Sequence, residues 1–246
     1  MADIILIRHA ESEINVIGEA YQRGNDLFTP EVLTTPDAAF PLTRVGIHHA
    51  HDLGNWLRET YGLKRFVATT SEYRRAEQTY TELGFKQSAC IESALDEHDW
   101  GDFMRSHPLN SSKQRFSFDR HYATDCTVQA PHGESTADVY RRVSQYWRQN
   151  REHFTTTQLI VSHERTLIVL QMVIEGIQLT DQNWAKAYKV RAGLPNVGIV
   201  IYTLEFGALR RVQLEWPYAN LSMYENAVKS GNYESALLYN KSVKAL

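Results

Sequence analysis

The stretch Ile4-Ile5-Leu6-Ile7 forms a continuous apolar run that leads directly into Arg8-His9. A short run without polar alternation is typical of a strand that is buried on both faces of a parallel sheet. Two similar runs follow at Phe66-Val67-Ala68-Thr69 and Leu159-Ile160-Val161, with a weaker one over residues 85–91. The sequence therefore predicts a sheet built around buried parallel strands.

Segments with helical periodicity separate these strands. Thr43 can cap a helix whose apolar residues recur at helical spacing as far as Leu57, and a second helix is predicted over residues 73–83. The pattern Ser135-Thr136-Ala137-Asp138 is typical of a capping box and starts a helix that reaches about Phe154. A further helix is predicted from Leu167 to Ile174.

The last predicted elements are two strands, Val197–Leu204 and Leu209–Leu214, joined by a turn at Gly207. Strands that alternate with helices indicate an α/β fold, a three-layer α/β/α sandwich with a mostly parallel central sheet. The chain shows no internal repeat and no linker, so we expect a single domain over residues 1–246. Two irregular, mainly polar insertions are expected in it, at about residues 16–40 and 98–132, the second as a surface excursion with too few apolar residues for a core.

The composition excludes several classes of protein. The 246 residues are 43% hydrophobic, and the formal net charge of −3 gives no general attraction to nucleic acid or to an acidic membrane. The two cysteines, Cys90 and Cys126, cannot form a disulfide framework or a cysteine zinc cage. The apolar run at residues 4–7 is too short for the core of a signal peptide and follows no basic segment, so we expect no signal peptide. We therefore expect a cytoplasmic protein that binds neither nucleic acid nor membrane; the composition indicates no particular oligomeric state.

Residues suited to phosphate chemistry follow three of the predicted strands. The first strand ends at Arg8-His9, the second leads to Ser71 and Arg75, and a later one ends at Ser162-His163. Sites in open α/β sheets lie beyond the carboxyl ends of the strands, so these side chains should meet. Arginine forks bind phosphate oxygens bidentately, and a neutral imidazole can attack phosphorus. The set predicts a pocket for a phosphate monoester.

Other histidines in the chain have simpler interpretations. A single histidine after a buried strand is more often a core residue, and the histidines on the helix after Thr43 lack the i, i+4 spacing of a metal-binding pair. We expect solvated helix positions for the first three of the following histidines and surface loops for the other four: His48, His49, His51, His98, His107, His121 and His132.

The stretch Arg8-His9-Ala10-Glu11-Ser12-Glu13-Ile14-Asn15 resembles the R-H-G-E-[ST]-x-x-N signature of the histidine phosphatase superfamily, the phosphoglycerate mutase-like clan. Further segments are similar to motifs of this family and occur in the family's order over most of the chain. These are Pro41-Leu42-Thr43-Arg44-Val45-Gly46, Ser71-Glu72-Tyr73-Arg74-Arg75-Ala76-Glu77-Gln78-Thr79, Leu95-Asp96-Glu97-His98-Asp99-Trp100-Gly101, Gly133-Glu134-Ser135, Val161-Ser162-His163 and Pro195-Asn196-Val197-Gly198.

The resemblance implies roles for individual residues around the phosphoryl group. His9 would be the nucleophile and would form a covalent phosphohistidine. Arg8, Arg75 and His163 would hold the phosphoryl oxygens, and Asn15 would help to orient the site. The family pattern implies neither a metal nor an organic cofactor.

The resemblance also implies a general acid and a substrate loop. Glu97 would protonate the leaving-group oxygen and later activate water, with Glu134 and Asp99 as the next candidates for the acid. Gln22-Arg23-Gly24, followed by Asn25, is a candidate phosphate-facing loop, because backbone amides near a glycine can surround an anion.

Three features depart from the family pattern. Ala10 replaces a glycine next to the proposed nucleophile, and residues 26–40 look like an insertion that could form part of a lid. Glu164 replaces the glycine that commonly follows the second histidine. A carboxylate there stabilises the N-terminus of the following helix, so we expect a structural role for it.

Three functions fit these features. The first is a metal-independent phosphatase acting on small phosphorylated substrates. The second is a cofactor-dependent phosphoglycerate mutase, but residues 106–131 contain Lys113, Arg115 and Arg120 without the proline run of the mutases. The third is a non-catalytic protein that binds phosphorylated ligands, for which Glu97 would not be needed. We expect the phosphatase.

Overall fold

A six-stranded, mostly parallel sheet lies at the centre of the described part of the chain. The computed structural model describes residues 3–111, 117–118, 120–205 and 208–214. The strand order is β3-β2-β4-β1-β5-β6, and β5 is antiparallel to both of its neighbours, β1 and β6, whereas the other pairs are parallel. The strands are β1 (Ile4–Arg8), β2 (Phe66–Thr70), β3 (Cys90–Ile91), β4 (Thr157–Ser162), β5 (Ile199–Glu205) and β6 (Ala208–Leu214).

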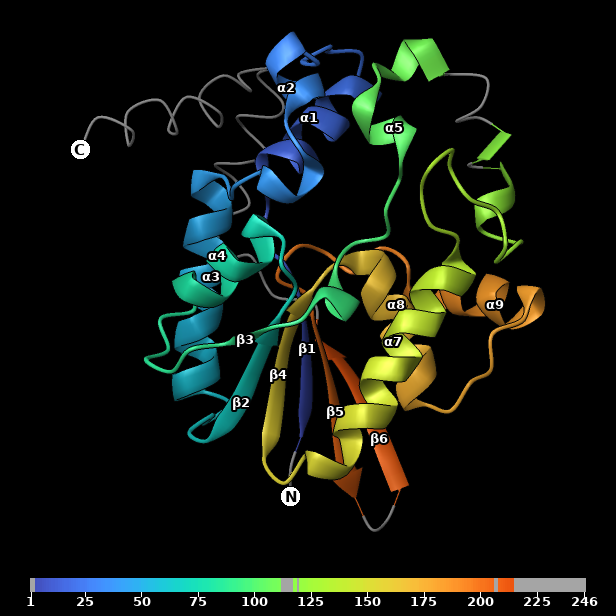
Figure 1. Cartoon of the computed structure of the whole chain (residues 1–246). Coiled ribbons are helices and arrows are strands. Elements are labelled where there is room, and N and C mark those ends of the chain that lie inside the picture. The colour runs from blue at the N-terminus through green and yellow to red at the C-terminus, as the bar shows by residue number, and fades with distance from the viewer. Residues whose placement is uncertain (1–2, 112–116, 119, 206–207, 215–246) are drawn as a thin grey trace.

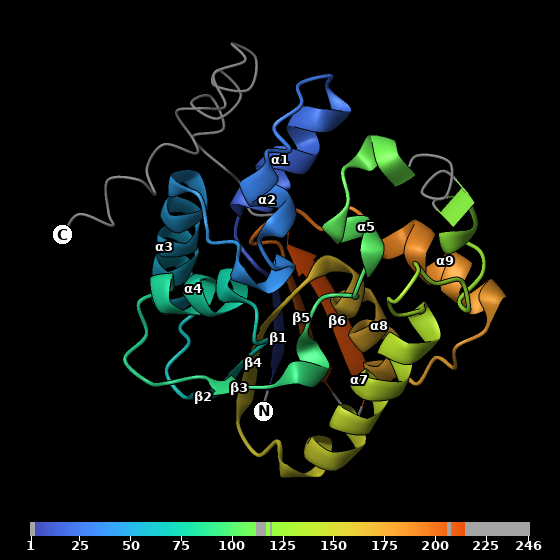
Figure 2. The same ribbon diagram turned by 45° about the horizontal axis from the view of Figure 1, so that its top comes forward.

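Helices cover both faces of the sheet (Figures 1 and 2). α3 (Arg44–Glu59) and α4 (Arg74–Glu82) lie on one face, and α7 (Thr136–Asn150) and α8 (Glu164–Ile174) on the other, with α9 (Asp181–Arg191) beside α8. The expected three-layer α/β/α sandwich is thereby confirmed. Beyond the carboxyl ends of the parallel strands lie three further helices: α1 (Glu13–Gln22), α2 (Pro30–Thr34) and α5 (Asp102–Arg105).

The central strand β1 joins the two halves of the core. Ile5, Leu6 and Ile7 are all completely buried. Ile5 and Ile7 belong to the apolar cluster on the α3 and α4 face, whereas Leu6 belongs to the cluster on the α7 and α8 face. Alternate side chains of a strand point to opposite faces, so a run without polar residues is what a strand covered on both sides requires.

Two helix starts follow the expected capping. The hydroxyl of Thr43 accepts a hydrogen bond from Gly46 N at 3.0 Å at the start of α3. At the start of α7, Ser135 and Asp138 form the predicted reciprocal capping box. Such caps satisfy amide groups that the first helical turn leaves without a partner.

The third strand is shorter than expected. The prediction placed it over residues 85–91, but only Cys90 and Ile91 pair with β2. Gly84 turns the chain after α4 with a φ of +73°, and the Phe85 ring packs against Phe66, 4.7 Å away between centroids. Phe85, whose apolar side chain suggested a strand, therefore packs against the apolar cluster on the α3 and α4 face and is not part of β3.

The two insertions are more ordered than expected. The first carries most of helix α1, the helix α2 and a short 3-10 helix at Asp37–Ala39, so the expectation of irregular structure over residues 16–40 is wrong for these parts. The second contributes to the core of the α7 and α8 face, through the buried residues Phe103, Phe118, Tyr122, Cys126 and Ala130. The expected surface excursion is therefore wrong.

Helix α9 adds to the core of the α7 and α8 face. Helix α9, which the sequence reading did not predict, buries Trp184 against this core, and its indole NH donates to Tyr122 O at 2.6 Å. The expected turn at Gly207 lies outside the described residues. None of the helices in the described ranges is long and apolar enough to cross a membrane.

Candidate active site

Two histidines lie side by side where neighbouring parallel strands end. β1 and β4 pair in register up to Arg8 and Ser162, so the next residues, His9 and His163, occupy equivalent positions. His9 N donates to Ser162 O at 2.9 Å, and the two imidazole rings are 5.0 Å apart between centroids. Both side chains are buried, with 2% and 0% of the surface of each residue exposed. The expected meeting of the strand ends is thus present.

The hydrogen bonds of His9 fix its tautomer. Its Nδ1 lies 2.7 Å from Ala10 O, and a carbonyl oxygen only accepts, so Nδ1 carries the proton. Burial lowers the pKa of His9 well below its ordinary value, and the charges of Arg75 and Arg8 lower it further. The imidazole is therefore neutral, with the lone pair on Nε2.

His163 is held from the second strand, β2. Its Nε2 lies 2.7 Å from the hydroxyl of Ser71, whose amide donates to Val161 O at 3.2 Å. Burial lowers the pKa of His163 well below its ordinary value, and Arg75 and His9 add to the shift. The buried Nδ1 has no hydrogen-bond partner among the described residues.

Two arginines supply positive charge beside these imidazoles. Arg75, in the first turn of α4, is 3% exposed, and both of its terminal nitrogens bond to Asp37. Arg8 pairs with Glu164 at 3.0 Å. Glu164 also accepts from Gly193 N at 2.6 Å and lies in the first turn of α8, as its expected structural role requires.

The predicted acid Glu97 lines a cavity next to this centre. The cavity has a volume of about 1080 Å³, and Tyr73 and Asp37 also line it. One oxygen of Glu97 accepts from His98 N at 2.9 Å. Burial raises the pKa of Glu97, whereas the charge of Arg75 opposes the shift. A carboxyl group that holds its proton more strongly is suited to general acid catalysis.

The other candidate acids, Glu134 and Asp99, line the same cavity but make polar contacts of their own. Both oxygens of Glu134 bond to Arg142, at 2.9 and 3.0 Å. Asp99 accepts from Gly101 N at 2.8 Å. Asp96, which the sequence reading did not consider as an acid, also has a pKa raised by burial, to about 6, and accepts from Glu72 N.

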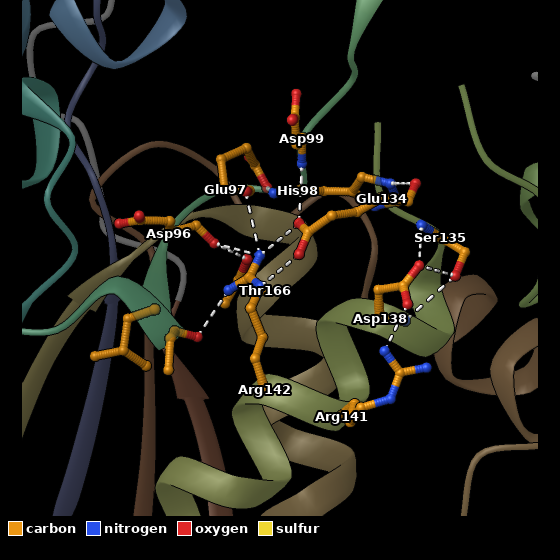
Figure 3. A network of polar contacts seen from close by, with 12 residues as sticks. Asp96, Glu97, His98, Asp99, Glu134, Ser135, Asp138, Arg141, Arg142 and Thr166 are labelled. Atoms are coloured by element: carbon orange, nitrogen blue, oxygen red, sulfur yellow. Dashed lines mark hydrogen bonds and ion pairs between the residues drawn. The ribbon is translucent and has the colours of Figure 1, made fainter. Parts of the chain in front are cut away.

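Arg142 holds the loop that carries Glu97 (Figure 3). Besides the two bonds to Glu134, its guanidinium donates to the backbone oxygens of Ala94, Asp96 and Glu97 at 2.7, 3.0 and 3.2 Å. The sequence reading gave this arginine no role, because its loop partners are 45 to 48 residues away in the chain.

The remaining predicted site residues lie at different places. Asn15 is near the centre, and its Oδ1 accepts from Ser12. The side-chain nitrogen of Asn196 donates to His9 O at 2.9 Å and lies 3.4 Å from Asn15 Oδ1. Gln22, Arg23 and Gly24 are exposed where α1 ends, and Arg23 pairs with Glu19 of the same helix. Within the described ranges, no hydrogen bond or ion pair joins this loop to either histidine.

Among the other histidines, His98 is a correction to the sequence reading. It is 1% exposed rather than on the surface, and its nitrogens lie 2.6 Å from Glu134 O and 3.0 Å from Tyr122 OH. His107 is partly buried and lies 2.8 Å from Asp26. Where the structure describes the chain, no group of three or more His, Cys, Asp or Glu side chains is placed to hold a metal ion.

Of the other five histidines assigned above to solvated helix or loop positions, His49 is half-buried. The remaining four of this set are exposed, as expected: His48, His51, His121 and His132.

A comparison with protein families agrees with this geometry. The family model described as histidine phosphatase superfamily (branch 1) matches residues 4–205. The chain belongs to this superfamily. The match extends from β1 through β5 and therefore includes every strand end that contributes to the site.

Curated relatives share about a third of the residues in the aligned part of the chain. Phosphoglycerate mutase-like protein AT74 of Arabidopsis thaliana is 32% identical over 193 residues, which are 69% of this chain and 56% of that protein. The match thus spans little more than half of that relative. The 2,3-bisphosphoglycerate-dependent phosphoglycerate mutase of Bartonella bacilliformis is 31% identical over 185 residues, 71% of this chain and 82% of the mutase.

The fold is also shared with solved structures of other proteins. A mycobacterial glucosyl-3-phosphoglycerate phosphatase, in complex with VO3, superposes with a TM-score of 0.66 and 17% identity, covering 88% of this chain and 98% of that one. At this identity the similarity concerns the fold.

Proposed function

We propose that this protein is a phosphatase that hydrolyses phosphate monoesters through a covalent phosphohistidine on His9. The observation that carries the proposal is the tautomer of His9, which leaves Nε2 with a free lone pair in a buried site next to Arg75. A neutral imidazole is the form that can attack phosphorus. Buried guanidinium and imidazole groups beside it can stabilise the charge of the transferring phosphoryl group.

The reaction would proceed in two steps, phosphorylation of His9 and hydrolysis of the phosphohistidine. In the first, His9 Nε2 forms a bond to phosphorus while the bond to the ester oxygen breaks, and Glu97 donates its proton to the leaving oxygen. In the second, Glu97 takes a proton from water as the water oxygen attacks phosphorus. The bond between nitrogen and phosphorus then breaks, inorganic phosphate forms, and phosphate release leaves His9 neutral. The raised pKa of Glu97 supports its first role.

The charges around the cavity favour a phosphatase over a mutase. A phosphoglycerate mutase must bind the carboxylate of its substrate as well as the phosphate, which calls for cationic side chains. Among the residues that the structure describes, two arginines line the cavity, Arg105 and Arg142, and Arg142 already holds Glu134. Six carboxylates line it: Asp37, Glu92, Asp96, Glu97, Asp99 and Glu134.

The mutase remains the second candidate because the Bartonella relative is named as one. Of the basic residues in the middle segment, Arg120 is exposed, whereas Lys113 and Arg115 lie outside the described residues. A non-catalytic binding protein is a weaker candidate, since binding alone does not require a carboxyl group of raised pKa beside the phosphate site.

A panel of phosphate esters tests the proposal. The purified chain should release inorganic phosphate from p-nitrophenyl phosphate and from several alkyl phosphates, with EDTA present, whereas the His9→Ala variant should release none. Monophosphoglycerates are then supplied with and without 2,3-bisphosphoglycerate. Interconversion of 2- and 3-phosphoglycerate faster than phosphate release would identify a mutase. Binding of phosphate without turnover of any ester would identify a binding protein.

A further inference from the structure

The side chain of Asp37 occupies the arginine fork that the proposed function assigns to the substrate. The two carboxylate oxygens of Asp37 lie 3.2 and 3.1 Å from the two terminal nitrogens of Arg75, and its backbone oxygen lies 2.7 Å from one of them. Only 4% of the Arg75 side chain and 15% of the Asp37 side chain are exposed. This is a shielded bidentate pair.

A phosphoryl group and a carboxylate cannot both use this fork. Planar arginine forks bind phosphate in the same bidentate way as they bind carboxylate. Both terminal nitrogens of Arg75 are already engaged, and the remaining nitrogen, Nε, is buried without a hydrogen-bond partner within the described ranges. A phosphate dianion that approached with Asp37 in place would also meet a like charge, which is unfavourable.

The segment that carries Asp37 contains no fully buried residue. Asp37 begins the short helix η1 (Asp37–Ala39), and none of residues 21–39 is buried, whereas Phe40 is 4% exposed. Segments with few buried apolar contacts open at low free-energy cost. Asp37 and Ala38 also line the cavity that contains Glu97. Movement of η1 would therefore connect this cavity to Arg75.

We propose that Asp37 is an internal competitor of the substrate, a carboxylate that closes the phosphate site of the free protein and that the phosphoryl group must displace. The inference rests on the proposed function, because it takes Arg75 as the arginine that binds the phosphoryl group. Only the fraction of molecules with η1 displaced can bind phosphate, so the apparent affinity is reduced by that fraction. The pairing of Asp37 with Arg75 thereby lowers the apparent affinity of the site for every phosphate ester.

Direct binding of inorganic phosphate to the whole chain, measured by calorimetry, tests this inference without relying on turnover. Asp37→Ala should bind phosphate at least roughly tenfold more tightly than the unmodified protein, as expected if about a tenth or less of the molecules are open. Asp37→Asn should lie between them, because it keeps the shape of the side chain and one oxygen that can accept from Arg75 but loses the charge, while the contact of the backbone oxygen stays in both variants. Glu31→Gln is the matched control, since it removes the same charge from an exposed position of α2 and should change nothing.

Kinetics with p-nitrophenyl phosphate provide the second measurement. Asp37→Ala should lower KM by about the same factor as it tightens phosphate binding and should leave kcat at least as high. Unchanged or weaker phosphate binding, or a loss of kcat, would overturn the inference. If Asp37→Ala does not fold, Asp37→Asn decides by the same criteria.

The two proposals fail in different ways. Tighter phosphate binding without turnover of any ester would keep Asp37 as the competitor and reject the phosphatase. Turnover through His9, together with a phosphate affinity that the Asp37 variants do not change, would support the phosphatase and reject Asp37 as the competitor.

Discussion

Replacing Arg142 by methionine should destabilise the protein by about 3 kcal/mol, because this one guanidinium ties α7 to the loop of the proposed acid. The change removes both bonds to Glu134 and the three to the backbone oxygens of Ala94, Asp96 and Glu97. Breaking a buried ion pair costs about 3–5 kcal/mol. The lower end applies here, because 21% and 25% of the two side chains are exposed and water can replace part of the lost contacts. Methionine keeps most of the apolar stem.

The neighbouring Arg141 offers a matched control. It lies on the same helix and forms an ion pair with Asp138 (Figure 3). The distance is 2.7 Å, and the Arg141 side chain is 73% exposed. Such pairs contribute about 0.3–0.5 kcal/mol, so Arg141→Met should be nearly neutral. Urea denaturation followed by circular dichroism measures both variants. Folded Arg142→Met protein should also show a kcat for alkyl phosphates reduced roughly 10-fold or more, because Glu97 loses its anchor. Equal losses of stability in the two variants would refute the proposed role of Arg142.

The remaining predictions concern packing, pH and catalysis. Gly54→Ala should lower the free energy of unfolding by about 3 kcal/mol, since the new Cβ would lie 2.1 Å from Leu83 O. Gly18→Ala, whose Cβ meets nothing within 4 Å, should instead stabilise α1 by about 0.5–1 kcal/mol. Thermal unfolding compares the two variants, and similar shifts of their melting temperatures would contradict the packing of Gly54. Burial lowers the pKa of His98 to about 4 from 6.5, so the unfolded chain binds more protons than the folded chain between these pH values. About 3 kcal/mol of stability, present above pH 6.5, should therefore be lost as the pH falls to 4. His98→Gln should flatten the plot of stability against pH in this range. Glu97→Gln should slow alkyl phosphates roughly 100-fold more than p-nitrophenyl phosphate, whose leaving group needs no proton, and equal slowing would show that Glu97 only shapes the cavity.

Local patterns in the sequence were sufficient for the sheet and for part of the site. The continuous apolar runs at β1 and β4 predicted strands covered on both faces, and the residues directly after them had to meet because paired parallel strands end together. The capping box at Ser135 was also a local signal, since it involves residues only three positions apart.

Features that depend on contacts distant in sequence could not be predicted. The insertion carrying Phe103 and Tyr122 is polar on average, so its composition suggested a surface segment, although its aromatic side chains pack together against α9. The pairing of Asp37 with Arg75 joins residues 38 positions apart, and nothing in either segment indicates the other. Tertiary packing decides such features, and sequence periodicity does not report it.

The identity of the nucleophile is tested most directly by trapping the phosphorylated protein. The chain is mixed with a radiolabelled phosphate ester and quenched within one turnover under alkaline denaturing conditions, and the labelled peptide is mapped by mass spectrometry. We expect base-stable, acid-labile phosphate on His9, and no label on a folded His9→Ala variant, which should also lack turnover. Phosphate on His163 or on another side chain, or turnover that persists in His9→Ala, would contradict the mechanism.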